Sequence, residues 1–342
     1  MDLTTHYLGL TLKNPLVASA APSNADLGHL RQLEDAGAAA VVLPSLFEEQ
    51  IASADGRFDA ILAAGVDNNP EAHHHYLPPA RIAQAPYGLR PDRYLEHVRR
   101  ARESLSIPVI ASLNGTTPDG WEDYGRRLQQ AGAHALELNL YAVPTDLDET
   151  GEQIEARYVS VVKTLRAQLD IPLAVKMSPY FTATGNVARR FADAGANGLV
   201  IFNRFVQPDI DLRKLRLSSE LAPSSAADIR LPLQWIALLA GRVPVSLAAS
   251  TGVETADEVI KYLYAGADVV MATSTVMRNG PVCFTRLLDG LREWFDARGV
   301  GSLARIRGAM SFAKLKDPGA YARGHYIDTL QTWAREQRQE TE

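Results

Sequence analysis

A short phrase, Ala-Gly-Ala, recurs along the chain and constrains its fold more than any other feature. Each copy lies between a helix-like segment and an apolar run, at residues 36–38, 131–133, 194–196 and 265–267. Glycine suits a helix C-terminus because it tolerates positive φ. Four other apolar runs each begin directly after a proline, at Pro15, Pro108, Pro172 and Pro244. Proline as the first residue of a strand removes no hydrogen bond that the strand needs. Both phrases therefore mark places where strands begin.

Together the phrases indicate about eight strands, separated mostly by amphipathic helices. This alternation predicts an α/β fold of the (β/α)₈ TIM-barrel type. An open, doubly wound sheet is the alternative, but the strand count and the unbroken alternation favour closure. The expected strands are Leu16–Ser19, Ala40–Leu43, Val109–Leu113, Ala135–Asn139, Leu173–Lys176, Gly198–Phe202, Val245–Ala248 and Val269–Ala272.

Two connections, about 46–107 and 204–242, are too long for simple barrel loops. Long ordered insertions often form lids or substrate walls, so we expect both at the C-terminal face of the strands. The tail, about 299–342, has no strand signal and is expected to pack helically outside the barrel. Since no linker interrupts the chain, residues 1–342 are expected to form one domain. Within the first insertion we expect helices at Phe47–Leu62 and Pro91–Leu105.

Charge and composition exclude several classes of function. The net charge is -5 and no long basic run occurs, which argues against a nucleic-acid partner. The single cysteine, Cys283, cannot form an intrachain disulfide or a cysteine-ligated iron–sulfur cluster. Met1–Lys13 does not have the pattern of a signal peptide, and no apolar stretch is long enough to span a membrane. We therefore expect a cytoplasmic protein. No metal site is predicted, because adjacent residues such as His73–His75 do not converge on one ion.

Lys176 is the first candidate for chemistry. It ends the short apolar strand that Pro172 and Pro179 enclose. The carboxyl ends of barrel strands are where such folds carry out their chemistry. The structural alternative is a lysine that pairs with a carboxylate inside the barrel. A further alternative is a Schiff-base nucleophile that acts on a small phosphorylated sugar, as in an aldolase or lyase.

Hydroxyl groups and a glycine follow the seventh and eighth strands, where this fold usually binds phosphate. Thr255 and Glu258 have the spacing of a capping box, so a helix should begin there. The free N–H groups at the start of that helix attract an anion. Ordinary helix capping is the alternative interpretation. The candidate phosphate ligands are Thr251, Gly252, Thr273 and Ser274.

Polar side chains also gather at the ends of the other expected strands. They are Ser19, Ser45, Asn114, Asn139 and Asn203. Amides around a barrel mouth can donate to and accept from a ring that carries carbonyls and ring nitrogens. A lysine among them favours negative charge on that ring, as in a reduced flavin. The set suits a flavin better than it suits a small sugar.

Taken in order, these segments resemble the FMN-containing dihydroorotate dehydrogenases and their dihydropyrimidine dehydrogenase relatives. The resemblance covers most of the chain. Asn14–Ser19 looks like the first flavin-contacting strand, Glu137–Leu140 like the start of the ELNLSCPN motif, and Val175–Pro179 like the VKLSP motif. Thr251–Val253 and Thr273–Thr275 fall in register with the GGI and GTA phosphate motifs.

The resemblance implies an FMN-dependent oxidoreductase of pyrimidine metabolism that acts on a CH–CH group. Hydride would pass between a dihydropyrimidine-like substrate and flavin N5. It implies that Lys176, Asn114, Asn139 and Asn203 lie at or near the isoalloxazine ring. Ala18, Ser19 and Ser45 would line the flavin, and Thr251, Gly252, Thr273 and Ser274 would hold its phosphate.

The chain departs from the family pattern at the catalytic base. Ala142 stands where the family has cysteine or serine, and Tyr141 precedes it. Alanine cannot move a proton, and an unperturbed tyrosine with a pKa of about 10 is a better acid than base. One hypothesis is therefore an ene-reductase-like enzyme with Tyr141 as its acid. Another is a flavin-binding electron-transfer subunit without dihydroorotate activity. We also expect a homodimer and, as a further possibility, an electron-transfer partner chain.

Overall fold

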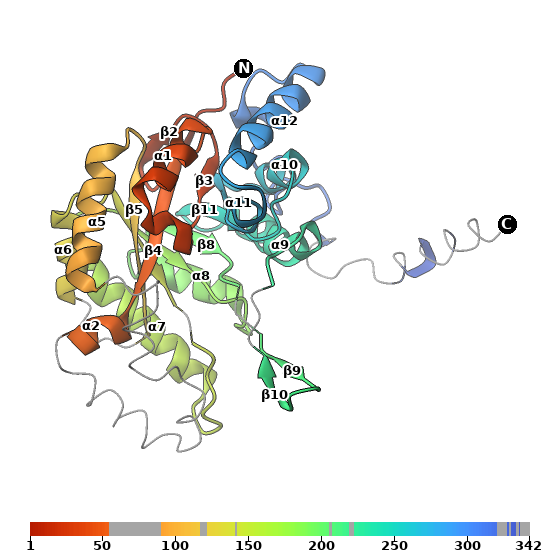
Figure 1. Cartoon of the computed structure of the whole chain (residues 1–342). Helices are drawn as coiled ribbons and strands as arrows, with labels where there is room; N and C mark the ends of the chain where they lie inside the picture. Colours follow the sequence, from red (N-terminus) through yellow and green to blue (C-terminus); the bar gives the residue numbers. More distant parts are fainter. Residues whose placement is uncertain are drawn as a thin grey trace.

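A barrel of eight strands forms the centre of the protein (Figure 1). The computed structural model describes residues 1–54, 90–116, 122–140, 142–204, 207–218 and 222–319, with a few positions of the tail beyond. The barrel strands are β3 (Leu16–Ala18), β4 (Ala40–Phe47), β5 (Val109–Asn114), β6 (Ala135–Asn139), β7 (Leu173–Lys176), β8 (Gly198–Ile201), β11 (Ser246–Ser250) and β12 (Val269–Ala272). They close in the order β11-β12-β3-β4-β5-β6-β7-β8, and all neighbours are parallel. The predicted TIM barrel is therefore confirmed.

Each predicted strand overlaps one barrel strand, and the largest difference is at β4. The sequence predicted that this strand ends at Leu43, but it continues to Phe47. Its register with β5 shifts between Val42 and Ser45, and Pro44 lies in this irregular stretch. A proline is tolerated in a strand at such a bulge because no ladder donor is needed there. Ser45 thus lies within the strand, not after it.

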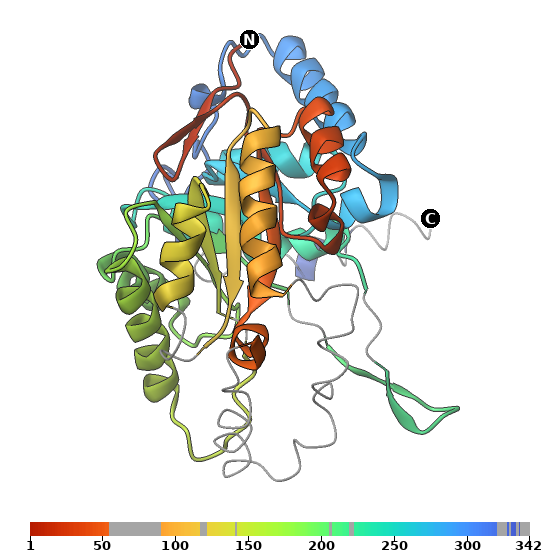
Figure 2. The same cartoon turned by 60° about the vertical axis from the view of Figure 1, so that its left-hand side comes forward.

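Helices wrap the outside of the barrel (Figures 1 and 2). They are α1 (Leu27–Asp35), α2 (Glu48–Ala54), α5 (Pro91–Ser104), α6 (Glu122–Gln130), α7 (Gly151–Arg166), α8 (Thr184–Asp193), α9 (Arg230–Leu239), α10 (Ala256–Ala265), α11 (Ser274–Asn279) and α12 (Cys283–Ala297). Short 3₁₀ turns are η1 (Pro22–Ala25), η3 (Ala226–Ile229) and η4 (Leu303–Arg305). The helix expected at Pro91–Leu105 is confirmed by α5. Of the helix expected at Phe47–Leu62, the part after Ala54 lies outside the described residues.

The glycines of the Ala-Gly-Ala phrases do end helices, as predicted. All four have positive φ, from +96° to +120°, at Gly37, Gly132, Gly195 and Gly266. A side chain is disfavoured in that conformation, so the repeated phrase reflects a repeated backbone requirement. Each chain segment then turns directly into the next strand.

Alternation along the strands divides the core into two layers. Leu16 and Val41 face the helices, whereas Val17 and Val42 fill the barrel interior. The N-terminal strands β1 (Thr5–Tyr7) and β2 (Leu10–Leu12) form an antiparallel hairpin that contributes to this interior cluster. The apolar hairpin closes the N-terminal end of the barrel, which leaves the C-terminal end for polar groups.

The second insertion carries a hairpin that projects from the barrel body (Figures 1 and 2). Its strands are β9 (Asp209–Asp211) and β10 (Arg216–Ser218). The described start of the tail, Gly299–Gly319, contains η4 and a bridge between Asp2 and Ser302. Within the described part of the chain, every helix is too short or too polar to cross a bilayer.

Candidate active site

The inward-facing positions change from apolar to polar toward the C-terminal end of the barrel. On β6 the inward side chains run Ala135, Glu137, Asn139, and on β7 they run Ala174, Lys176. Side chains at i and i+2 share one face of a strand, which explains why these residues meet. The polar groups are buried all the same: Glu137 is 0% exposed and Lys176 7%.

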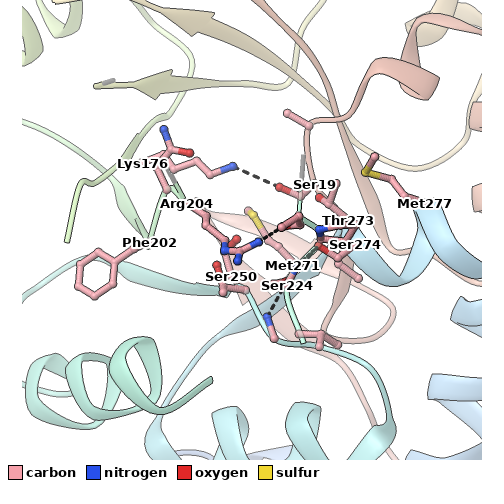
Figure 3. Close-up of a pocket in the computed structure, with 18 of the residues that line it drawn as sticks. Ser19, Lys176, Phe202, Arg204, Ser224, Ser250, Met271, Thr273, Ser274 and Met277 are labelled. Carbon is pink, nitrogen blue, oxygen red and sulfur yellow. Dashed lines mark hydrogen bonds between the residues drawn. The ribbon is translucent and has the colours of Figure 1, made fainter. Parts of the chain in front are cut away.

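A cavity of about 530 Å³ opens above the ends of β3, β7, β8, β11 and β12 (Figure 3). This size lies in the ordinary range for cofactor and ligand sites. The structure brings seven of the predicted residues together around it: Ser19, Lys176, Asn203, Thr251, Gly252, Thr273 and Ser274. It also adds Arg204, Ser224 and Ser250, which the sequence had not indicated.

Lys176 lies at the base of this cavity. Its Nζ is 3.4 Å from the Ser19 hydroxyl, to which it donates, and 3.5 Å from Glu137 Oε1 (Figure 3 shows the Ser19 contact). The lysine is thus paired with an internal carboxylate and also faces the cavity. The contact with Glu137 agrees with the structural interpretation, in which the lysine pairs with a carboxylate inside the barrel. The position at the cavity leaves the functional interpretation open.

A second polar group lies on β4, β5 and β6, beside Lys176. Asn139 Nδ2 donates to Ser45 Oγ at 3.0 Å, and Ser45 Oγ is 2.8 Å from Ser112 Oγ. Asn139 is paired in register with Asn114 on one side and with Lys176 on the other. Asn139 Oδ1 is buried and has no partner among the described residues. An acceptor in this state is suited to a donor on a bound ligand.

Ala18 differs from the expectation that it lines the flavin. Its side chain packs with the outer core layer between barrel and helices. The next residue, Ser19, lines the cavity, and Ala18 does not. Contact of this strand with a flavin stays a prediction.

The backbone after β11 is held in an unusual conformation. Thr251 has φ +88° and Gly252 has φ +76°. A β-carbon on Gly252 would lie 2.9 Å from Ile229 N and 3.0 Å from Ser225 O. Glycine is therefore required by both its φ and the close approach of the 225–229 backbone. The predicted capping box of α10 is present: the Glu258 carboxylate accepts from the Thr255 N–H and hydroxyl.

Ser224 joins the loops after β11 and β12. Its N–H donates to Ser274 Oγ at 2.9 Å, and the two hydroxyls are also 2.9 Å apart. Gly252 N–H in turn donates to Ser224 Oγ at 3.1 Å. Arg278 donates to the Ser224 carbonyl at 2.8 Å and to Glu254 at 2.7 Å. Ser224 lies far from any predicted strand end, so no local pattern indicated it.

Tyr262, on α10, stabilises the strained turn after β11. Its hydroxyl donates to the carbonyls of Thr251, at 2.7 Å, and of Ser250, at 3.3 Å. Burial, and then the negative charges of Glu258 and Asp228, raise the pKa of this phenol far above its ordinary value. The group therefore stays protonated and remains a donor.

The strain at Thr251 gives a testable expectation. Thr251→Gly should stabilise the protein by roughly 0.5–1 kcal/mol, because relief of strain exceeds the added freedom of the unfolded chain. Thermal unfolding measures the change. Thr251→Ala is the matched control, because it keeps a β-carbon at φ +88° and should gain nothing. Equal stabilisation by both variants would contradict the strain account.

The structure describes only part of the segment in which the family has its catalytic base. Tyr141 lies outside the described residues. Ala142 lines a second cavity, of about 410 Å³, together with Tyr158, Phe181 and Pro208. Gln207 lines both cavities, so the two adjoin at the second insertion. The run His73–His75 also lies outside the described residues.

The sequence of this chain is similar to those of known proteins. The family model described as dihydroorotate dehydrogenase matches residues 89–295, more than half of the chain. Dihydroorotate dehydrogenase B (NAD(+)), catalytic subunit, of Geobacillus kaustophilus is 27% identical over 248 residues, 68% of this chain and 78% of that protein. The protein of the same name from Pyrococcus furiosus is 25% identical over 323 residues, 90% of this chain and 98% of that protein.

The matched region begins before β5 and includes β5–β8, β11 and β12, with Lys176 and the hydroxyl groups that follow β11 and β12. The curated relatives extend the similarity over nearly the whole barrel. This chain belongs to the dihydroorotate dehydrogenase family of oxidoreductases.

Proposed function

We propose that this protein is an FMN-dependent oxidoreductase that transfers hydride between flavin N5 and a CH–CH bond of a pyrimidine-like or other unsaturated ring. The observation that carries the proposal is the cavity itself. Lys176, Ser19, Gly252, Thr273 and Ser274 all line it. A cationic group and a cluster of small donors in one cavity suit a ring and a terminal phosphate.

The phosphate end fits a phosphate group chemically. It offers the hydroxyl of Ser274, which accepts from Ser224 Oγ at 2.9 Å, on a turn whose Gly252 N–H donates to Ser224 Oγ at 3.1 Å. The absence of a β-carbon at Gly252 keeps this turn against the 225–229 backbone. Backbone N–H groups and hydroxyls at such a turn bind phosphate oxygens well.

The ring end fits a flavin through different groups. Lys176 would place positive charge beside the ring, and Asn203, which lines the cavity, would supply amide contacts. Asn139 Oδ1, on the strand beside Lys176, has no partner among the described residues and is proposed as a further acceptor. FMN, when bound, supplies the hydride acceptor or donor at N5. The protein residues would orient the ring and balance its charge.

The substrate half of the site is where we propose a departure from dihydroorotate oxidation. Ala142 cannot accept a proton, so Tyr141 is proposed as an acid for reduction of an activated double bond. A role in pyrimidine metabolism, and a cytoplasmic location, stay predictions from the sequence and the family.

The experiment is an absorption spectrum of the purified protein, followed by anaerobic addition of dihydroorotate. We expect a flavin spectrum that stays oxidised with dihydroorotate. A flavin spectrum that bleaches would mean that dihydroorotate is the substrate and that another group replaces the base. A colourless protein that fails to take up added FMN would contradict the proposal and leave the phosphate-binding lyase, which borohydride trapping at Lys176 tests.

An electron-transfer partner is a second proposal, and the names of the relatives favour it. Both are catalytic subunits of NAD(+)-type enzymes. The single cysteine, Cys283, cannot hold an iron–sulfur cluster, so such a centre would belong to the partner. A protein that binds FMN but turns over no small molecule without an added partner chain would support this role.

We also propose a homodimer that uses the projecting β9–β10 hairpin. Isolated two-stranded hairpins are marginally stable in water, and large exposed apolar patches mark interaction sites. Four apolar residues of the hairpin are 51–84% exposed: Ile210, Leu212, Leu215 and Leu217.

Leu212→Lys combined with Leu215→Lys should convert the dimer to a monomer in sedimentation at micromolar concentration. The matched control is Leu147→Lys, at a leucine that is 98% exposed outside the hairpin, and it should stay dimeric. A double variant that remains dimeric would place the interface elsewhere.

A further inference from the structure

The barrel interior contains a carboxylate that the reaction outlined above does not use. Glu137 lies in the middle of β6, is 0% exposed, and sits between the apolar lower layer and the cavity. A carboxylate is strongly disfavoured in such surroundings unless it is paired. Its presence therefore requires an explanation from its neighbours.

Lys176 is the cation that pairs with Glu137 in the described part of the chain. The Nζ–Oε1 distance is 3.5 Å, and the side chains are 9% and 0% exposed. Neither oxygen of Glu137 has a hydrogen-bond partner in the same part of the structure. On its other side, Lys176 contacts the Ser19 hydroxyl at 3.4 Å, as Figure 3 shows. The ammonium group is thus held between an internal charge and a hydroxyl that lines the cavity.

Tyr7 is a second titratable group on which the charge of Glu137 acts. It reaches the interior from the hairpin at the N-terminal end, and its buried hydroxyl has no partner among the described residues. Burial, and then the charge of Glu137, raise the pKa of Tyr7 well above its ordinary value. Tyr7 therefore stays neutral, and Lys176 is left to balance the charge of Glu137.

We infer that Glu137 is a positioning residue for Lys176, and that the pair sets how strongly the cavity prefers reduced over oxidised FMN. The inference rests on the proposed function. Reduced flavin carries negative charge at the ring edge that a cation attracts. Glu137 holds that cation in place and offsets part of its charge. The preference for the reduced form is therefore smaller than an unpaired lysine would produce.

The pairing is tested first without any flavin. Glu137→Gln or Lys176→Met alone leaves one buried charge unpaired, and each should lower the melting temperature by roughly 6–10 °C. The double variant removes both charges and should recover at least half of that loss. If either single variant fails to fold, the double variant still reports the coupling. A double variant no more stable than Lys176→Met would overturn the pairing.

The control breaks an ion pair of similar chemistry at the surface. Glu149→Gln removes the contact between Glu149 and Arg157, whose side chains are 22% and 37% exposed. Exposed pairs contribute little to stability, so the melting temperature should change by less than about 2 °C.

The second measurement is the affinity for oxidised and for chemically reduced FMN, under anaerobic conditions. Glu137→Gln should raise the ratio of reduced to oxidised affinity by about tenfold, which is about 30 mV for a two-electron couple. Lys176→Met should lower the ratio, and Glu149→Gln should leave it unchanged. A purely structural Glu137 would weaken both affinities equally.

Different results contradict the proposed function and the role of Glu137. A wild-type protein that binds neither form of FMN overturns the proposed function. A wild-type protein that binds FMN, with the same affinity ratio in Glu137→Gln, overturns the inference and leaves the proposed function intact.

Discussion

Replacing Gly252 by alanine is expected to weaken FMN binding by roughly 10²-fold, about 3 kcal/mol. The added β-carbon would meet Ile229 N at 2.9 Å and Ser225 O at 3.0 Å. Both are backbone atoms and cannot move aside as a flexible side chain would. The turn after β11 must therefore shift, and its N–H would leave the position beside Ser224.

The same substitution should lower the stability of the flavin-free protein by about 2–4 kcal/mol, because φ +76° adds strain to the overlap. FMN titration by fluorescence quenching and thermal unfolding measure the two effects. Gly299→Ala is the matched control: Gly299 has φ +61° and open space around its β-carbon position. It should lose some stability and no FMN affinity. Gly252→Ala protein that binds FMN within twofold of wild type would show that this turn does not hold the phosphate.

The second large effect is expected at Tyr141. Tyr141→Phe should slow the reaction of the protein with its substrate by roughly 10²–10⁴-fold, the usual contribution of general acid–base catalysis. FMN affinity should stay unchanged, since the proposed role concerns the proton alone. Anaerobic stopped-flow measurements would follow flavin oxidation by activated double bonds and flavin reduction by dihydropyrimidines.

A matched tyrosine variant separates this effect from a general loss of packing. Tyr264 on α10 packs edge-to-face against Trp294, with ring centroids 5.8 Å apart, away from the cavity. Tyr264→Phe should leave both rates unchanged. Unchanged rates in Tyr141→Phe would show that the acid is another group or that no acid is needed.

The local part of the fold was open to prediction from the sequence. Strand periodicity, prolines at strand starts and glycines at helix ends each act over a few residues. The eight strands and the ends of the helices followed from them. The capping box at Thr255 and Glu258 is likewise a local pattern, and the structure contains it.

The candidate site was predictable to the extent that it depends on strand ends. Lys176, Ser19 and Asn203 follow or end strands, and closure of the barrel brings them to one cavity. Ala18 shows the limit of this reasoning. Neighbouring residues of a strand face opposite sides, so Ala18 packs in the outer core although Ser19 lines the cavity. The extension of β4 to Phe47 was missed because it depends on pairing with β5 beyond a bulge.

By itself, then, the sequence determined the barrel, the order of its strands and the set of polar residues at their ends. Only the tertiary structure placed Ser224 against Gly252, and Glu137 against Lys176. Propensity and periodicity are set by neighbours in the chain, whereas a buried ion pair or a backbone contact depends on which strands and insertions the closed barrel brings together. Such contacts have no local signal, and they are the ones on which the proposed chemistry depends.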